Sequence, residues 1–265
     1  MLEVNAVSQS QQSEPRTGSR DGPAEAVIQF RNVNLQVNQK YLVEDLVFEV
    51  LRGETLVLLG RSGSGKTTTL KLINRLLEPT SGDVCVEGTS TRSWNQIELR
   101  RHIGYVIQDT GLFPHFNVER NIAVVPRLKG WQENRTRERV RELLELVGLD
   151  PGMFANRYPR ELSGGQRQRV GVARALAADP PIVLMDEPFG ALDPLTRAEL
   201  QREFAMLTKR LNKTIVFVTH DIREAYTLAS RIGLFKDGHL IELDTPDRFA
   251  SSNDPEAQAF NKSIE

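Results

Sequence analysis

The chain has 265 residues, of which 39% are hydrophobic and 26% charged, enough for one large globular domain. Its 34 Lys and Arg residues balance 35 Asp and Glu residues, without the basic excess typical of nucleic-acid-binding proteins, so we expect no nucleic-acid partner. The single cysteine, Cys85, cannot form an intrachain disulfide, and the scattered histidines show no zinc-ligand spacing.

The composition of the two ends and the lengths of the apolar runs set the expected boundaries. Residues 1–26 are rich in Ser, Gln, Glu and Gly and lack the basic start and apolar stretch of a signal peptide, so we expect a disordered N-terminal tail. A membrane span needs about 18 consecutive apolar residues, and no such run occurs, which predicts a soluble, intracellular protein. We expect one folded domain over residues 27–250 and a C-terminal tail over residues 251–265.

Apolar side chains follow two different patterns along the expected domain. Period-two alternation within residues 27–50, and a similar short segment at 82–86, favour antiparallel strands with one exposed face. Continuous apolar runs at 56–59, 182–185 and 215–218 are typical of strands buried on both faces of a parallel sheet.

Helix-like segments follow these continuous runs. After the first run, apolar residues share one helical face over residues 67–77, and Glu78-Pro79 is expected to end that helix. Residues 107–178 contain no buried-strand run and are expected to be mostly helical. The sequence therefore predicts an α/β fold with a mainly parallel core sheet, an antiparallel β subdomain near the N-terminus, and a helical subdomain over about residues 108–178.

A glycine-rich segment lies between the first continuous run and the helix that follows it. The segment is Gly60-Arg61-Ser62-Gly63-Ser64-Gly65-Lys66-Thr67, which matches the phosphate-binding loop of nucleoside triphosphatases at every required position. Its glycines let backbone N–H groups cradle phosphate oxygens, and the helix N-terminus adds positive potential. We expect Lys66 to contact the β- and γ-phosphates of ATP, Thr67 to hold Mg²⁺, and Thr68 to complete the loop's nucleotide site.

Two adjacent carboxylates end the second continuous run. In Ile182-Val183-Leu184-Met185-Asp186-Glu187-Pro188 they stand at the C-terminal end of a buried strand, where parallel sheets place their ligand sites. Taken alone, the two carboxylates could equally well be the polar end of a strand where a loop begins. Together with the phosphate-binding loop, Asp186 suits Mg²⁺, directly or through water, and Glu187 suits polarising the water that attacks the γ-phosphate.

A second glycine-containing helix start follows the predicted helical region. Leu162-Ser163-Gly164-Gly165-Gln166 has Ser163 and Gln166 at the spacing of a capping box, which alone would indicate an ordinary helix start. A cap does not require two glycines, which lower helix propensity, whereas bare N–H groups at a helix N-terminus form a second anion site. One bound nucleotide cannot need both this anion site and the phosphate-binding loop of the same chain. The segment matches the signature motif of ATP-binding-cassette (ABC) ATPases, a family that the chain resembles over about residues 27–238.

The resemblance implies roles for three more polar residues. Gln108 resembles the glutamine that links the Mg²⁺ site to the membrane partner, Asp193 the residue that communicates across a dimer, and His220 the switch histidine that contacts the γ-phosphate. Without the order of motifs that the chain shares with the family, each of the three would be interpreted as an ordinary loop or helix-start residue. The implied catalytic residues are Lys66, Gln108, Glu187 and His220, and the implied Mg²⁺ ligands are Thr67, Gln108 and Asp186.

The expected contact with adenine departs from the family's pattern. Family members usually carry an aromatic residue that stacks on adenine before the second N-terminal strand, and here Val37 occupies that position. Tyr41, four residues later, could replace it or could be an ordinary strand-face residue. Loss of the stacking ring would cost on the order of 1–3 kcal/mol, while the phosphate and Mg²⁺ contacts would still hold the nucleotide.

The resemblance also implies partners. Two copies would form a head-to-tail dimer in which Ser163, Gly164, Gly165 and Gln166 of one copy close over the ATP bound at Lys66 of the other. A transmembrane permease would receive the motion through residues 108–125, with a substrate-binding protein taking part indirectly, at the cytoplasmic face of the cell membrane. A soluble ABC ATPase of translation or DNA maintenance is the alternative, but the tandem cassettes, coiled coils and zinc modules typical of that class do not occur in the sequence.

The transported solute is indicated by resemblance alone. Ile103–Gln108, Gly111–His115 and Asn121–Pro126 together resemble ATPase subunits of importers for glycine betaine, choline and other quaternary amines. The central segment also occurs in polyamine and sugar importers, so another small solute (a polyamine, amino acid or sugar) is the alternative. Many betaine-system ATPases continue into a paired regulatory module, and because the sequence ends at Glu265 we expect osmoprotectant import without gating by such a module.

Overall fold

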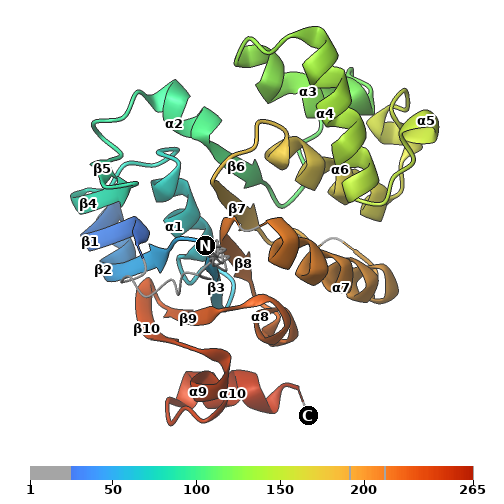
Figure 1. Cartoon of the computed structure of the whole chain (residues 1–265). Helices are drawn as coiled ribbons and strands as arrows, with labels where there is room; N and C mark the ends of the chain where they lie inside the picture. The colour runs from blue at the N-terminus through green and yellow to red at the C-terminus, as the bar shows by residue number, and fades with distance from the viewer. Residues whose placement is uncertain (1–24, 191, 212, 265) are drawn as a thin grey trace, which may run out of the picture.

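Two sheets organise the chain (Figure 1). The computed structural model describes residues 25–190, 192–211 and 213–264, so residues 1–24 of the expected N-terminal tail lie outside the described residues. The smaller sheet is antiparallel, with the order β2-β1-β4-β5, and consists of β1 (Ala26–Val37), β2 (Lys40–Leu51), β4 (Ser81–Val86) and β5 (Thr89–Ser90). The larger sheet has the order β10-β9-β3-β8-β7-β6 and is parallel except for the edge pair β9–β10. Its strands are β3 (Thr55–Gly60), β6 (Ile103–Val106), β7 (Ile182–Asp186), β8 (Thr214–Thr219), β9 (Arg231–Lys236) and β10 (His239–Asp244).

Helices surround the larger sheet and also form a separate lobe. They are α1 (Lys66–Ile73), α2 (Gln96–His102), α3 (Val118–Leu128), α4 (Glu133–Leu146), α5 (Pro151–Phe154), α6 (Gly164–Leu176), α7 (Pro194–Leu211), α8 (Ile222–Leu228), α9 (Pro246–Ala250) and α10 (Pro255–Lys262), with a 3₁₀ turn at Pro159–Glu161. Helices α3 to α6, green to yellow in Figure 1, lie together as a helical lobe beyond the β6 edge. The predicted α/β fold, with a mainly parallel core sheet, an antiparallel β subdomain and a helical subdomain, is therefore confirmed.

The three continuous apolar runs form the centre of the larger sheet. All described residues of β3, β7 and β8 are buried, as predicted for strands covered on both faces. Alternate residues enter different cores: Val57, Met185 and Phe217 belong to one hydrophobic cluster, and Leu58, Leu184 and Val218 to the other. The second cluster also contains apolar side chains of α1, β1 and β2, so α1 packs between the two sheets.

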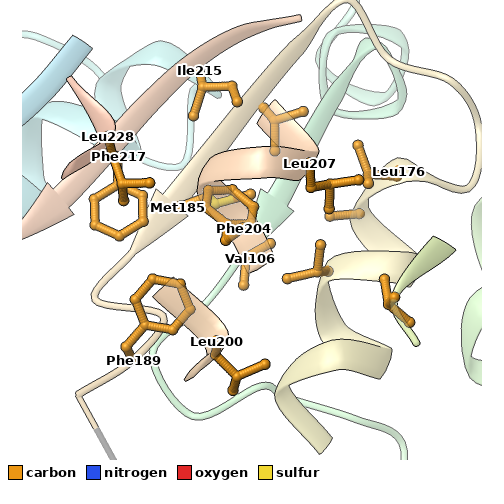
Figure 2. Packing of buried hydrophobic residues seen from close by; sticks show 14 of the residues in the cluster. Val106, Leu176, Met185, Phe189, Leu200, Phe204, Leu207, Ile215, Phe217 and Leu228 are labelled. Carbon is orange, nitrogen blue, oxygen red and sulfur yellow. The ribbon is translucent and has the colours of Figure 1, made fainter. Parts of the chain in front are cut away.

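Three phenylalanines anchor the segment that follows β7 (Figure 2). Phe189 has its ring centroid 5.8 Å from that of Phe217 on β8 and 5.9 Å from that of Phe204 on α7, and the latter two lie 6.2 Å apart. These separations lie in the favourable range for aromatic pairs. Phe189 is only 3% exposed, so the chain immediately after Glu187 is held against the sheet.

The expected helix over residues 67–77 is shorter than predicted. Helix α1 ends at Ile73, Asn74 forms its C-cap, and Arg75 has a φ of 52°. The guanidinium of Arg75 donates hydrogen bonds to the carbonyl oxygens of Thr91 (3.3 Å) and Trp94 (3.2 Å), so long-range contacts favour the turn. The segment expected as a C-terminal tail, residues 251–265, contains α10, which buries Ala257.

The backbones of β6 and α6 approach each other closely at Gly104 of β6, where no side chain separates them. A Cβ atom added at Gly104 would lie 2.5 Å from the carbonyl oxygen of Ala175 on α6, closer than real Cβ atoms approach.

None of the helices within the described ranges is both long and apolar enough to cross a bilayer.

We expect Gly104→Ala to lower the free energy of unfolding by about 1–3 kcal/mol, because the added methyl group must separate β6 from α6. The matched control is Gly171→Ala inside α6, where an added Cβ meets only ordinary contacts of 3.8 Å or longer. This control should raise the free energy of unfolding by roughly 0.5–1 kcal/mol through helix propensity. Urea unfolding followed by circular dichroism measures both, and equal midpoints for the two variants would contradict the close-packing interpretation.

Candidate functional site

A cleft of about 860 Å³ opens at the C-terminal ends of the central strands, a volume suited to a nucleotide-sized ligand. It is lined by Leu42, Arg61, Ser62, Gly63, Ser64, Gly65, Lys66, Thr67, Thr68, Gln108, Glu187, His220, Ala259, Phe260 and Ser263. The structure thus brings together Gln108, Glu187 and His220 with the predicted phosphate-binding loop, although these residues are far apart in sequence.

The loop connects β3 directly to α1, as its sequence predicts. Gly65 is the N-cap residue of α1 and has a φ of 105°, a conformation that residues with a Cβ rarely adopt. A Cβ atom there would also lie 2.9 Å from the carbonyl oxygen of Leu42. Glycine is therefore required at position 65, and the N–H groups of the first turn of α1 remain accessible to an anion in the cleft.

The ammonium group of Lys66 lies under this loop. Its Nζ atom donates hydrogen bonds to the carbonyl oxygens of Gly60 and Arg61, both at 2.8 Å, and the residue is 4% exposed. Burial lowers the pKa of Lys66, and the negative charges of Glu187 and Asp186 oppose that shift. A cation is thus held beside the loop, where phosphate oxygens would lie.

Asp186 lies beneath the cleft and contacts two hydroxyl groups. Thr67 Oγ1 donates a hydrogen bond to Asp186 Oδ1 at 2.7 Å, and the Tyr105 hydroxyl donates to Oδ2 at 3.4 Å. Burial raises the pKa of Asp186, an effect that the hydrogen bond from Thr67 opposes. Burial also raises the pKa of Tyr105, as does the adjacent carboxylate, so this phenol remains a donor.

These oxygen atoms are suitable for Mg²⁺. Within the described ranges no group of three or more His, Cys, Asp or Glu side chains forms a metal cage. Mg²⁺ in nucleotide sites does not need one, because it binds one or two protein oxygens together with substrate phosphates and water. The Thr67 hydroxyl and the Asp186 carboxylate, adjacent at 2.7 Å, provide such a pair, and Gln108 adds an amide on the cleft wall.

Glu187 and His220 form a pair at the cleft surface. His220 Nδ1 lies 3.0 Å from Glu187 Oε2, and the exposed fractions of their side chains are 55% and 19%. The backbone of Glu187 is held by its N–H, which donates to the carbonyl oxygen of Val218 at 3.0 Å. Adjacent ends of β7 and β8 thus place a carboxylate and an imidazole side by side, and a carboxylate in such a position can accept a proton from water.

The predicted signature residues lie away from this cleft, at the start of α6 on the helical lobe. Ser163 Oγ accepts from the N–H of Gln166 at 3.2 Å, and Gln166 Oε1 accepts from the N–H of Ser163 at 3.0 Å, which completes a capping box. Gly164 and Gly165 are not among the residues that line the cleft. Within one chain the signature residues and Lys66 therefore do not form a single site.

Asp193 lies beside the signature residues. It accepts a hydrogen bond from the N–H of Thr196 at 3.1 Å, and hydrogen bonds from Thr196 lower its pKa. A Cβ atom added at Gly165 would lie 2.8 Å from the methyl group of Thr196. The segment that begins α7 and the segment that begins α6 thus form one surface.

The two candidate adenine contacts do not line the cleft. Val37 and Tyr41 lie in the turn region between β1 and β2, with exposed fractions of 46% and 45%, and only Leu42 of this hairpin reaches the cleft. Sequence reasoning missed α10, which contributes Ala259, Phe260 and Ser263 to the lining. The helix-start pattern Asp254-Pro255 was the available signal, since Asp254 caps α10 and Pro255 is its first residue.

The chain is similar to known ATP-binding subunits of transporters over most of its length. The family described as ABC transporter matches residues 43–190, more than half of the chain. The glycine betaine/carnitine/choline transport ATP-binding protein OpuCA of Bacillus subtilis is 54% identical over 208 residues, which cover 78% of this chain and 54% of OpuCA. The glycine betaine uptake system ATP-binding protein YehX of Escherichia coli is 50% identical over 220 residues, which cover 83% of this chain and 71% of YehX.

A solved structure shares the fold. The dimeric post-hydrolysis state of the ATP-binding cassette MJ0796 bound to ADP and Pi superposes with a TM-score of 0.74 and 34% identity, covering 82% of this chain and 98% of that chain. The present chain spans about half the length of OpuCA. On its phosphate-binding loop, its signature segment and these matches, the chain belongs to the ABC transporter family.

Proposed function

We propose that the chain is the ATP-binding and ATP-hydrolysing subunit of an ABC importer, peripheral to the cytoplasmic face of the cell membrane. One observation carries this proposal: Lys66, Thr67, Glu187 and His220 line the same cleft. The phosphate-binding loop accounts for nucleotide binding, and the paired carboxylate and imidazole account for hydrolysis.

In this proposal Lys66 exchanges its contacts with the loop carbonyls for contacts with the β- and γ-phosphates, which carry more negative charge. Thr67 and Asp186 would hold Mg²⁺, which would neutralise charge on the phosphates. Glu187 orients the attacking water and accepts its proton, and His220, 3.0 Å from the Glu187 carboxylate, keeps that carboxylate directed into the cleft.

The proposed working unit is a head-to-tail dimer of two copies. Because the signature residues cap α6 on the helical lobe and do not line the cleft, they are available to a second copy. In a twofold arrangement, Ser163 and Gly165 of each copy would cover the nucleotide at Lys66 of the other, with Asp193 near the same boundary. The dimeric state stated for the MJ0796 cassette supports this assembly.

The proposed membrane partner is a permease, with a substrate-binding protein acting on its far side. Residues 108–125 are the proposed contact, and within them Phe113 and Phe116 are 48% and 37% exposed, as expected for a surface that meets a partner. The proposed solutes are glycine betaine, choline and related quaternary amines, since the names of OpuCA and YehX state transport of such compounds.

Replacement of the proposed base tests the chemistry. Glu187→Gln should retain ATP binding, slow phosphate release by about 10²–10⁴-fold, and accumulate an ATP-bound dimer, because the amide cannot accept the proton and removes a negative charge from the interface. Phosphate release and size-exclusion chromatography with ATP measure both effects. Glu138→Gln, at an exposed position of α4, is the matched control and should behave as the parent. Parent-rate hydrolysis by Glu187→Gln would remove Glu187 from the mechanism.

Mixing inactive variants tests the shared site. Lys66→Ala and Ser163→Arg proteins should each lose ATPase activity, and their mixture should recover part of it, because a mixed dimer contains one intact combination of phosphate-binding loop and signature residues. The specific activity of the parent should also rise with protein concentration. A parent activity strictly proportional to concentration, together with no recovery in the mixture, would contradict the composite site.

Transport assays test the solute. Deletion of the gene, in cells that lack other betaine importers, should reduce uptake of labelled glycine betaine and choline at high osmolarity while leaving uptake of a labelled polyamine unchanged. Expression of the parent chain from a plasmid should restore uptake, and the Glu187→Gln chain should not. Unchanged betaine and choline uptake would contradict the proposed solutes without affecting the proposed ATPase activity.

A further inference from the structure

The nucleotide cleft has a wall that the proposed catalytic residues do not use. Helix α10 contributes Ala259, Phe260 and Ser263 to it. Apart from Leu42, Phe260 is the one large hydrocarbon side chain among the lining residues of the described chain. Phosphates suit the polar loop, whereas a purine base is flat and largely apolar on its faces and therefore suits an aromatic ring.

Helix α10 is fixed to the core of the domain. The Tyr226 hydroxyl on α8 donates to Asn261 Oδ1 at 2.7 Å, and Asn261 Nδ2 donates to the carbonyl oxygen of Phe249 at 3.2 Å. Ala257 is fully buried, and Phe260 itself is partly buried against the hydrophobic cluster that contains Phe249. Phe260 is therefore positioned by the fold, with part of its ring surface left for the cleft.

The same helix is tied to the phosphate-binding loop. Glu256 Oε1 accepts from Arg61 Nε at 2.5 Å, and its other oxygen lies 3.7 Å from Lys236 Nζ. The Glu256 side chain is only 11% exposed and is held against the domain, whereas the Arg61 side chain that it contacts is 71% exposed. Arg61 belongs to the loop itself, and the wall formed by α10 is thus connected to the phosphate end of the cleft.

The β1–β2 hairpin offers no comparable surface. Val37 presents an aliphatic side chain, and Tyr41 lies outside the cleft lining with an exposed fraction of 45%. Because this proposal rests on the proposed nucleotide-binding function, it concerns only how the base is held. We propose that Phe260 of α10 supplies the aromatic surface that contacts the base of the bound nucleotide.

The test compares two ligands that share phosphates but differ in the base. Dissociation constants for ADP and for inorganic tripolyphosphate, both with Mg²⁺, are measured by calorimetry on the full chain. Phe260→Ala should weaken ADP binding by about 5- to 150-fold, the range of base–aromatic stacking, and leave tripolyphosphate binding unchanged. Phe260→Trp should restore ADP binding. Gln258→Ala, at an exposed position of α10 outside the cleft lining, is the matched control and should bind both ligands as the parent does.

Three results would overturn the proposal. The first is parent-like ADP binding by Phe260→Ala, and the second is an equal loss of ADP and tripolyphosphate binding in that variant, which would indicate a structural role for α10. The third is a selective loss of ADP binding in Tyr41→Ala instead of Phe260→Ala. Lys66→Ala separates this inference from the proposed function, because it should weaken both ligands. If Lys66→Ala binds both ligands as tightly as the parent, the proposed nucleotide site itself is wrong.

Discussion

The buried ammonium group of Lys66 imposes a strict condition on the rest of the structure. A cation removed from water needs polar partners, and the carbonyl oxygens of Gly60 and Arg61 meet that need at 2.8 Å each. These carbonyls face the ammonium only because β3 ends at Gly60 and the chain turns back before α1 begins at Lys66. β3 is in turn held between its parallel neighbours β8 and β9, so the position of one charge depends on the register of the central sheet.

Neighbouring strand ends then complete the site. β7 ends at Asp186 and β8 at Thr219, which brings Glu187 to His220 at the same edge where β3 delivers the loop. The helical lobe presents the signature residues on a different surface, where they satisfy their own helix start. The fold therefore divides two helix starts, α1 and α6, between the sheet and the lobe, which is the separation that the proposed dimer requires.

The sequence predicted those features that depend on local pattern. β3, β7 and β8 were identifiable because both of their faces are buried, and the loop because its glycines and lysine interact within eight residues. The contact of Tyr105 with Asp186 joins residues 81 positions apart, and no local pattern indicates it. The early end of α1 depends on carbonyls near Trp94, and α10 depends on a core that exists only after folding. The contacts that stabilise these features lie far along the chain, so local sequence patterns could indicate only the start of α10, at Asp254-Pro255.

The hydroxyl group of Thr67 has one hydrogen and two lone pairs, and its hydrogen is committed to Asp186. Thr67 also lines the cleft, where its oxygen can offer only lone pairs once the hydrogen is donated to Asp186. A metal ion can therefore be received without transfer or reorientation of a proton. Serine at this position would retain the same arrangement, whereas valine, of nearly the same shape, would fill the space and offer neither the hydrogen nor the lone pairs.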